Sequence, residues 1–179
     1  MRTYSNIIKG VRKDDTQAQM AFYDLFFQTI YQSAYVIVGN SDEAEEIMQD
    51  TLMKVLSKTE LLNQDMDAMR RILKRIASNH AIDIIRKRKD FFTSMDDEQW
   101  VDYTNEEETN EDEPSIEKIK EGINQLTIGY RSIISLRLFE EMSFAEIANQ
   151  LQLNPSTVRV QYTRGIAKLK MYLKQKTNE

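Results

Sequence analysis

Apolar residues recur three and four positions apart through most of the chain, the spacing that places them on one face of a helix. We therefore predict a bundle of helices in the first half. Gly39-Asn40 ends one of these helices and Ser41-Asp42 begins the next, which extends to about Lys58 with acids crowding its positive end. The apolar runs lie at residues 7–11, 20–38, 47–56 and 69–85.

Two capped helices joined by a short turn are predicted between residues 142 and 164. Ser143 and Glu146 have the spacing of a capping box, so the first helix begins near Phe144. Asn154-Pro155 begins the second helix, because Asn is a common N-cap and proline loses no hydrogen bond at the first helical position. This pattern predicts a helix-turn-helix. Its inward faces carry Phe144, Ile147, Ala148 and Leu151 in the first helix and Val158, Tyr162, Ile166, Leu169 and Leu173 in the second.

The outer face of the second helix combines short polar groups with guanidinium groups, which suits base edges and phosphates in a major groove. Six Lys or Arg and no acid lie between Asn154 and Lys176. A solvated amphipathic hairpin is the alternative interpretation, but the caps, the turn length and the charge asymmetry agree on DNA binding. The face carries Ser156, Arg159, Val160, Thr163 and Arg164.

Composition limits the classes of protein to which the chain can belong. It has 179 residues, 41% of them hydrophobic, with 5 Gly and 2 Pro, which favours an all-α fold of one or two small domains. The absence of cysteine fits a reducing compartment. The first residues lack the apolar core of a signal peptide, and no segment is apolar enough to span a bilayer. We expect a cytoplasmic protein without direct membrane insertion.

Charge is segregated along the chain, although the net charge is −5. Residues 96–113 contain ten acids and no base, so we predict a flexible acidic linker over 91–114 that joins domains at 1–90 and 115–179. Residues 61–67 are predicted to be a loop that leads into a long helix. That helix ends in a basic run at 86–89, and residues 70–90 hold eight Lys or Arg, a second candidate site for phosphate.

Catalytic chemistry is not indicated. His80 is the only histidine and has no Cys or His companion at metal-ligand spacing. The carboxylates do not form a pair enclosed by apolar residues, and there is no Gly-rich phosphate loop. We expect no enzyme activity, no catalytic residue, no metal and no cofactor.

Three segments resemble bacterial transcription initiation factors of the sigma-70 family, in the small extracytoplasmic-function (ECF) group. Residues 42–52, DEAEEIMQDTL, resemble the family's D-A-E-D-[LI]-V-Q-[ED]-T-F helix. Residues 76–88, IASNHAIDIIRKR, resemble its I-A-R-N-x-A-[IL]-D-x-[LI]-R-[RK]-[RK] helix. The lead-in to the helix-turn-helix is similar in Leu126, Tyr130, Arg131, Leu136 and Arg137. The resemblance covers nearly the whole chain outside the predicted linker.

The resemblance implies a sigma2-like helical bundle and a sigma4-like helix-turn-helix domain, and it assigns three sets of residues. The set for core RNA polymerase is Asp42, Glu45, Glu46, Gln49 and Asp50. The set for the −10 promoter element is Asn63, Gln64, Asp65, Asn79, Asp83, Arg86, Lys87 and Arg88. The set for the −35 element is Arg137, Ser156, Thr157, Arg159, Val160, Thr163 and Arg164.

Some of these assignments have alternatives. From composition alone the acidic helix would be only a solvated face. The alternative role for Asp83 is to orient neighbouring cations without contacting DNA. The resemblance also implies that the linker runs through the RNA exit path, that the factor assists DNA melting, and that an anti-sigma factor is a candidate partner. Two departures from the family pattern affect the second domain. Gln152 replaces the usual glycine of the turn, where a left-handed backbone is expected, and Thr127 replaces a proline and is expected to cap the next helix.

Two other classes of protein remain as alternatives. A stand-alone helix-turn-helix regulator would bind an operator, usually as a symmetric dimer. It would leave the motifs of the first half unexplained. A helical adaptor that binds only proteins would leave the cationic helix face without a role. DNA binding that requires polymerase separates the first interpretation from both.

Overall fold

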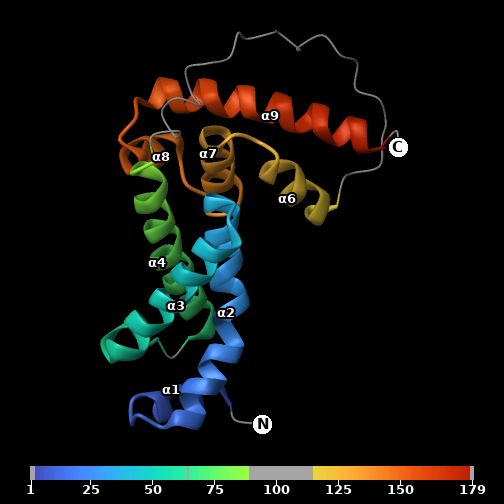
Figure 1. Cartoon of the computed structure of the whole chain (residues 1–179). Helices are drawn as coiled ribbons and strands as arrows, with labels where there is room; N and C mark the ends of the chain where they lie inside the picture. Colours follow the sequence, from blue (N-terminus) through green and yellow to red (C-terminus); the bar gives the residue numbers. More distant parts are fainter. Residues whose placement is uncertain (1–2, 64, 89–114, 178–179) are drawn as a thin grey trace. The chain divides into compact units, whose positions relative to one another are not determined.

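The computed structural model describes residues 3–63, 65–88 and 115–177, and every regular element within them is helical (Figure 1). The predicted all-α fold is therefore confirmed for this part of the chain. The residues form two compact units, Met1–Asp83 and Ile84–Glu179. The earlier elements are α1 (Tyr4–Val11), α2 (Thr16–Val38), α3 (Ser41–Ser57), the 3-10 turn η1 (Thr59–Leu61) and α4 (Met66–Arg86). The later ones are α6 (Ile116–Asn124), α7 (Ile128–Leu138), α8 (Phe144–Leu151) and α9 (Pro155–Thr177).

Two parts of the prediction lie outside the described residues, namely the acidic linker at 91–114 and Gln64. The domain bounds 1–90 and 115–179 therefore stay predictions. Among the helices that are described, none has the length and apolar character needed to cross a membrane.

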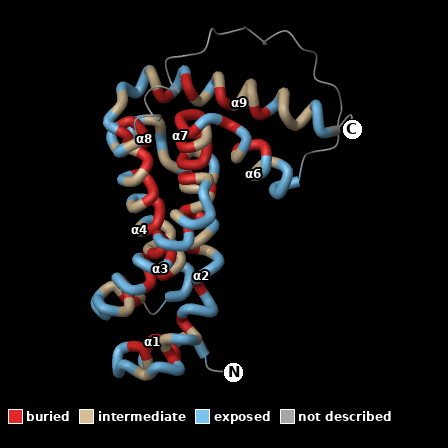
Figure 2. Tube along the Cα trace, in the orientation of Figure 1, coloured by how far each residue is buried: buried red, intermediate tan, exposed pale blue. Residues whose placement is uncertain are grey.

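Each helix of the first unit buries one apolar face (Figure 2). The rings of Phe22 and Phe26 on α2 have centroids 4.8 Å apart, and neither side chain is exposed. Burying a side chain of this size stabilises the fold by about 1.5–3 kcal/mol relative to exposure. The other fully buried large side chains include Ile30 and Ile37 of α2, Ile47 of α3, and Met69 and Leu73 of α4.

The junction of α2 and α3 lies where the sequence predicted it, with one difference in the cap. Gly39 ends α2 in a left-handed conformation, with φ 67°. Asn40 does not belong to the end of α2 but is the N-cap of α3, because its extended backbone lets its side chain accept from the N–H groups of Asp42 and Glu43. Both acceptor distances are 3.0 Å. This cap allows Ser41 to be the first helical residue.

The second unit packs α9 against α6, α7 and α8. Its core consists of Ile123, Leu126, Tyr130, Ile134 and Leu169. Gly165 brings α9 close to α7, since an added Cβ would lie 2.7 Å from Ile134 Cδ1. Ile119, Phe139, Tyr162, Ile166 and Leu173 pack around this core.

The predicted helix-turn-helix is confirmed in its details. Ser143 N donates to Glu146 Oε2 at 2.8 Å and Glu146 N donates to Ser143 Oγ at 3.2 Å, which completes the capping box before α8. Helix α9 begins at Pro155, and Asn154 Oδ1 accepts from Ser156 N at 3.0 Å. Two short-range patterns in the sequence were therefore sufficient to place both helix starts.

Thr127 does not act as predicted. It occupies the N-cap position of α7, but its side chain makes no capping hydrogen bond. The start of α7 is instead fixed by the burial of Ile128 and Tyr130, so packing replaces a hydroxyl cap at this position.

Gln152 has the left-handed backbone expected from its place in the turn, with φ 56° and ψ 42° at the end of α8. A side chain in this conformation costs about 1 kcal/mol that glycine avoids. We therefore expect Gln152→Gly to raise the free energy of unfolding by about 1 kcal/mol in a urea titration. Gln125→Gly is the matched control, because Gln125 follows α6 with φ −80° and glycine should lower stability there. Equal shifts from the two substitutions would contradict this explanation.

Candidate functional site

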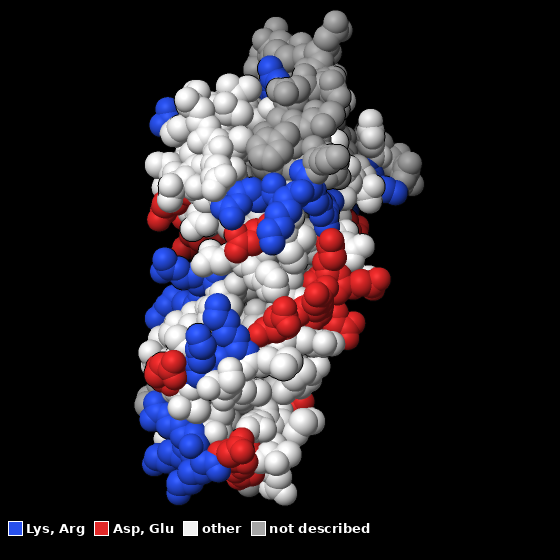
Figure 3. Space-filling model, turned by 60° about the vertical axis from the view of Figure 1, so that its left-hand side comes forward, with Lys and Arg blue, Asp and Glu red and all other residues white. Residues whose placement is uncertain are grey.

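The exposed face of α3 forms an acidic surface opposite its buried face. Ala44, Ile47 and Met48 are buried, so the carboxylates between them point to solvent. On the side of the molecule in view, Asp and Glu side chains form a contiguous group that is bordered by groups of Lys and Arg (Figure 3). The acidic surface consists of Asp42, Glu45, Glu46, Gln49 and Asp50, all exposed.

Met53 extends the acidic surface, and the sequence analysis did not name it. It lies four residues after Gln49 and seven after Glu46, so the helical period places it on the same face. Its side chain is 69% exposed, the highest value among the exposed large hydrophobic residues of the described chain. A flexible thioether in a charged surface is suited to contact with a partner protein. The spacing could have identified it, but methionine in a helix usually indicates a core position.

His80 of α4 lies beside the acidic surface. Its Nδ1 is 3.9 Å from Asp50 Oδ2, and both side chains are partly exposed. In the described residues there is no group of three or more His, Asp or Glu that could hold a metal. The contact between His80 and Asp50 joins α4 to α3.

Helix α4 exposes a row of polar residues at intervals of four. Asn79 and Asp83 of this row were assigned to the −10 element, as was Lys87, which directly follows the end of α4. Arg71 and Arg75 continue the row toward the start of the helix. All five are exposed, whereas Arg86 and Arg88 are half-buried. The residues predicted for the −10 element did not include Arg71 and Arg75, although both belong to the basic segment 70–90 that was predicted to bind phosphate.

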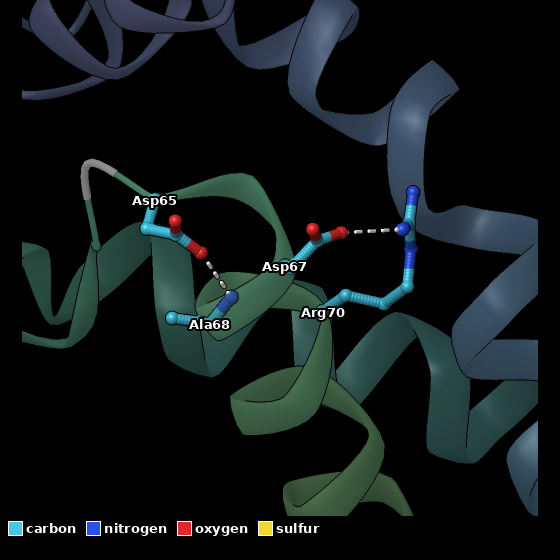
Figure 4. A network of polar contacts seen from close by, with 4 residues as sticks. All are labelled: Asp65, Asp67, Ala68 and Arg70. Atoms are coloured by element: carbon cyan, nitrogen blue, oxygen red, sulfur yellow. Dashed lines mark hydrogen bonds and ion pairs between the residues drawn. The ribbon is translucent and has the colours of Figure 1, made fainter.

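The turn before α4 consists of Leu62, Asn63 and Asp65 among the described residues. Asp65 N donates to Asn63 Oδ1 at 2.9 Å, and Ala68 N donates to Asp65 Oδ1 at 2.6 Å. The Asp65 carboxylate therefore caps α4, while Asp67 forms an ion pair of 3.0 Å with Arg70 (Figure 4). Asn63 is half-buried and Asp65 is exposed. Both predicted site residues thus also shape the turn.

The outer face of α9 exposes most of the residues predicted for it, but not all of them. Ser156, Arg159, Val160 and Thr163 are exposed, and Thr157 and Arg164 are half-buried. Val160 is 48% exposed, and an apolar side chain here suits contact with a thymine methyl group. Two hydroxyl groups already have internal partners, since Thr163 Oγ1 donates to Arg159 O at 3.1 Å and Ser156 Oγ donates to Asn154 Oδ1 at 2.8 Å.

Arg137 supports the connection between α7 and α8. Its Nη1 donates to Met142 O at 2.9 Å, and its guanidinium lies 5.1 Å from the centroid of the Phe144 ring. Phe144 in turn packs edge-on against Tyr162, with centroids 5.2 Å apart. Arg137 therefore holds α8 in place relative to α7 and α9, in addition to any contact with DNA.

Two family models match the chain, in the order in which the two units occur. Sigma-70 region 2 matches residues 22–91, and Sigma-70, region 4 matches residues 116–169. RNA polymerase sigma factor SigV of Bacillus subtilis is 30% identical over 146 residues, 82% of this chain and 85% of the relative. ECF RNA polymerase sigma factor SigW of the same species is 29% identical over 181 residues, 93% of this chain and 95% of the relative. The chain is also similar to a solved structure, the sigma factor RpoE of Bartonella quintana in complex with the anti-sigma factor NepR. The match is 20% identical in sequence, includes 87% of this chain and 96% of the RpoE chain, and has a TM-score of 0.49.

Proposed function

The chain belongs to the sigma-70 family, in its ECF group of transcription initiation factors, and we propose that it brings core RNA polymerase to promoters through three separate surfaces. The observation that supports this function best is the presence of region 2 and region 4 in one chain, in order. A stand-alone operator-binding regulator would account for region 4 alone. The factor therefore acts with core polymerase on promoter DNA.

The acidic surface of α3 and Met53 form the polymerase contact in this proposal. Exposed carboxylates attract a basic partner and orient it. Met53 adds an apolar contact that loses water when the partner binds. This combination supports a docking face over a face that is only solvated.

Met53→Ala provides a direct test of that contact. We expect the dissociation constant for core polymerase to rise about 5- to 30-fold, which corresponds to about 1–2 kcal/mol. The free energy of unfolding should change little, because the side chain is 69% exposed. Met20→Ala on α2 is the matched control, since Met20 is 58% exposed on a different helix. If both substitutions weaken binding equally, the contact is not specific to α3.

The polar row of α4 and the turn before it bind the −10 element in this proposal. Arg71, Arg75 and Lys87 neutralise phosphates, which position the protein on DNA. Asn79, together with Asn63 and Asp65 of the turn, offers hydrogen-bonding groups to bases. Helix α4 has no Phe, Tyr or Trp to stack unwound bases, so in this proposal assistance to melting depends on these polar contacts.

The N-terminal half of α9 binds the −35 element in this proposal. Arg159 and Val160 are the candidates for contact with base edges, because both are exposed near the start of the helix. Thr163 and Ser156 already donate hydrogen bonds within the protein, so they accept hydrogen bonds or contact the backbone of DNA. Arg137 and Arg164 contact phosphate groups of the DNA backbone.

The factor supplies recognition and contributes no catalytic group, since polymerase performs the chemistry of RNA synthesis. It would act in the cytoplasm, where polymerase and promoter DNA are found. An anti-sigma factor remains a candidate partner on the basis of the sequence resemblance.

The function is tested by run-off transcription with purified core polymerase. Sheared genomic DNA of the source organism is the template, and the 5′ ends of the transcripts are sequenced. We expect new starts downstream of a shared two-part motif only when the protein is added. If the protein neither binds core polymerase nor starts transcripts, yet shifts DNA alone, an operator-binding regulator replaces this proposal.

A further inference from the structure

Helix α1 contacts the turn before α4 from far away in the sequence. Tyr4 Oη donates to Asn63 O at 2.8 Å, across 59 residues. Arg12 Nη2 donates to Leu62 O at 3.1 Å, across 50 residues. The two donors lie at opposite ends of α1, and the two acceptors are consecutive carbonyl groups. Two bonds with this arrangement fix both the position and the direction of the turn.

Helix α1 is itself held firmly by α2. Ile7, Ile8 and Val11 are buried, and Ile8 is fully so. The Tyr4 ring packs edge-on against Phe26, with centroids 6.2 Å apart. At Gly10 the two helices approach so closely that an added Cβ would lie 2.5 Å from Ala18 Cβ. Because α1 is fixed on α2, its two hydrogen-bond donors hold the turn in one position.

The turn also has bonds on its inner side. Leu62 is only 4% exposed, and Asn63 N donates to Met69 Sδ at 3.4 Å. Asn63 Oδ1 accepts from Asp65 N, as described above. The N–H groups of Asn63 and Asp65 thus donate to nearby acceptors, while the carbonyl groups of Leu62 and Asn63 accept hydrogen bonds from Arg12 and Tyr4. The backbone direction at Asn63 decides which polar groups face a bound base.

The Tyr4 hydrogen bond persists over the pH range of any transcription assay. Burial, and secondly the charge of Asp65, raise the pKa of Tyr4 to about 12, so its phenol stays protonated and donates. Because this pKa is raised above the unfolded value, the contribution of Tyr4 to stability is complete below about pH 10 and is lost as pH rises through about 12.

We propose that α1 sets the shape of the turn before α4 and thereby the base that the protein accepts in the −10 element. Tyr4 and Arg12 are positioning residues that act through Asn63, and neither needs to touch DNA. This inference rests on the proposed function, in which the turn contacts a −10 base. Beyond that function, it makes base selectivity depend on Tyr4 and Arg12, which lie outside the contact between the turn and the DNA base.

The test uses the full chain with core polymerase. Tyr4→Phe keeps the ring contact with Phe26 and removes one hydrogen bond, and Arg12→Met removes the other, because methionine has no donor. Each position of the −10 element is varied in a promoter found by run-off transcription. We expect the double variant to lose about 3- to 10-fold of the discrimination at one position, and Arg12→Lys to restore part of it, because an ammonium group also donates.

Two control variants separate this effect from charge and from general loosening. Lys13→Gln removes a neighbouring positive charge, and Gln19→Met removes the exposed hydrogen bond of 2.7 Å from Gln19 Nε2 to Asp14 Oδ1. Neither should change base preference. Hydrogen exchange of peptides from the turn supplies a readout independent of promoters. It should be faster in the double variant while α3 peptides keep their rates.

A loop variant distinguishes failure of this inference from failure of the proposed function. If Asn63→Ala alters base preference and the double variant does not, α1 has no role in selection. If Asn63→Ala leaves base preference unchanged, the proposed contact of the turn with the −10 element is wrong, and the inference falls with it. Unchanged exchange of the turn in the double variant, or a uniform loss of activity at every −10 sequence, would also overturn the inference.

Discussion

Replacing Glu45 and Glu46 with lysine is expected to raise the dissociation constant for core polymerase by about 100-fold or more. Both carboxylates are exposed on the acidic surface of α3, and their reversal places like charges against a basic partner. Like-charge contacts across an interface cost several kcal/mol, which corresponds to at least two orders of magnitude in binding. The measurement is a competition titration against labelled wild-type protein at two salt concentrations.

The fold should survive this double substitution. The two side chains point away from the core, while Ile47 and Met48 beside them stay buried. Lysine in the early turns of α3 opposes the helix dipole by only about 0.3–1 kcal/mol per residue. Thermal unfolding should therefore shift slightly while binding is lost.

Glu117→Lys with Glu121→Lys is the matched control for charge. Both residues are exposed on α6, so the net charge changes equally at a different place. We expect little change in the affinity for core polymerase. A similar loss in the two double variants would show that the overall field of the protein matters, and that α3 is not the docking face.

Substitution of Arg159 by alanine should weaken recognition at a single base pair of the −35 element. We expect a cost of about 1–3 kcal/mol, roughly 5- to 150-fold, at the base pair that its guanidinium contacts. At promoters in which that base pair has already been changed, Arg159→Ala should have much less effect. Transcription from a set of promoters with single changes in the −35 element measures this coupling.

Salt dependence decides between a base contact and a phosphate contact at Arg159. A phosphate contact would weaken binding on all sequences and lower the salt slope by about 1. Lys170→Ala is the comparison, because Lys170 is exposed three turns further along α9. If Arg159→Ala resembles Lys170→Ala in both measurements, Arg159 does not read the sequence.

The helix boundaries were predictable because they depend on residues close together in the chain. The Ser143–Glu146 capping box, Pro155 at the start of α9 and the left-handed Gln152 all depend on interactions within a few residues. The same applies to Gly39 at the end of α2. Thr127 shows the limit, because a residue type that often caps helices made no cap where packing already fixed the helix start.

The candidate site was predictable in its helix faces but not in its supporting contacts. Periodicity placed Arg159 and Val160 on the exposed face of α9, and Glu45 and Glu46 on that of α3. The contacts of Tyr4 and Arg12 join residues 59 and 50 positions apart, and no pattern within α1 indicates which turn lies beside it. Long-range hydrogen bonds of this kind depend on the packing of whole helices.

Helix α9 is continuous from Pro155 to Thr177. The residues proposed for the −35 element lie in its first half, and Leu169 and Tyr172 in its second half lie beside α6. An added Cβ at Gly122 on α6 would lie 2.6 Å from Leu169 Cδ1 and 3.0 Å from Tyr172 Cδ1, so α6 fits the packed end tightly. At about 1.5 Å per residue the helix measures roughly 20 Å from Arg159 to Tyr172, and a tilt of about 5° at one end moves the other by about 2 Å. Helix α9 also packs against α7 at Gly165 and against α8, so a change of packing at α6 shifts α9 only together with these helices. We therefore expect substitutions that change side-chain volume around Gly122 to alter the preference for −35 sequences, although they change no residue proposed to contact DNA.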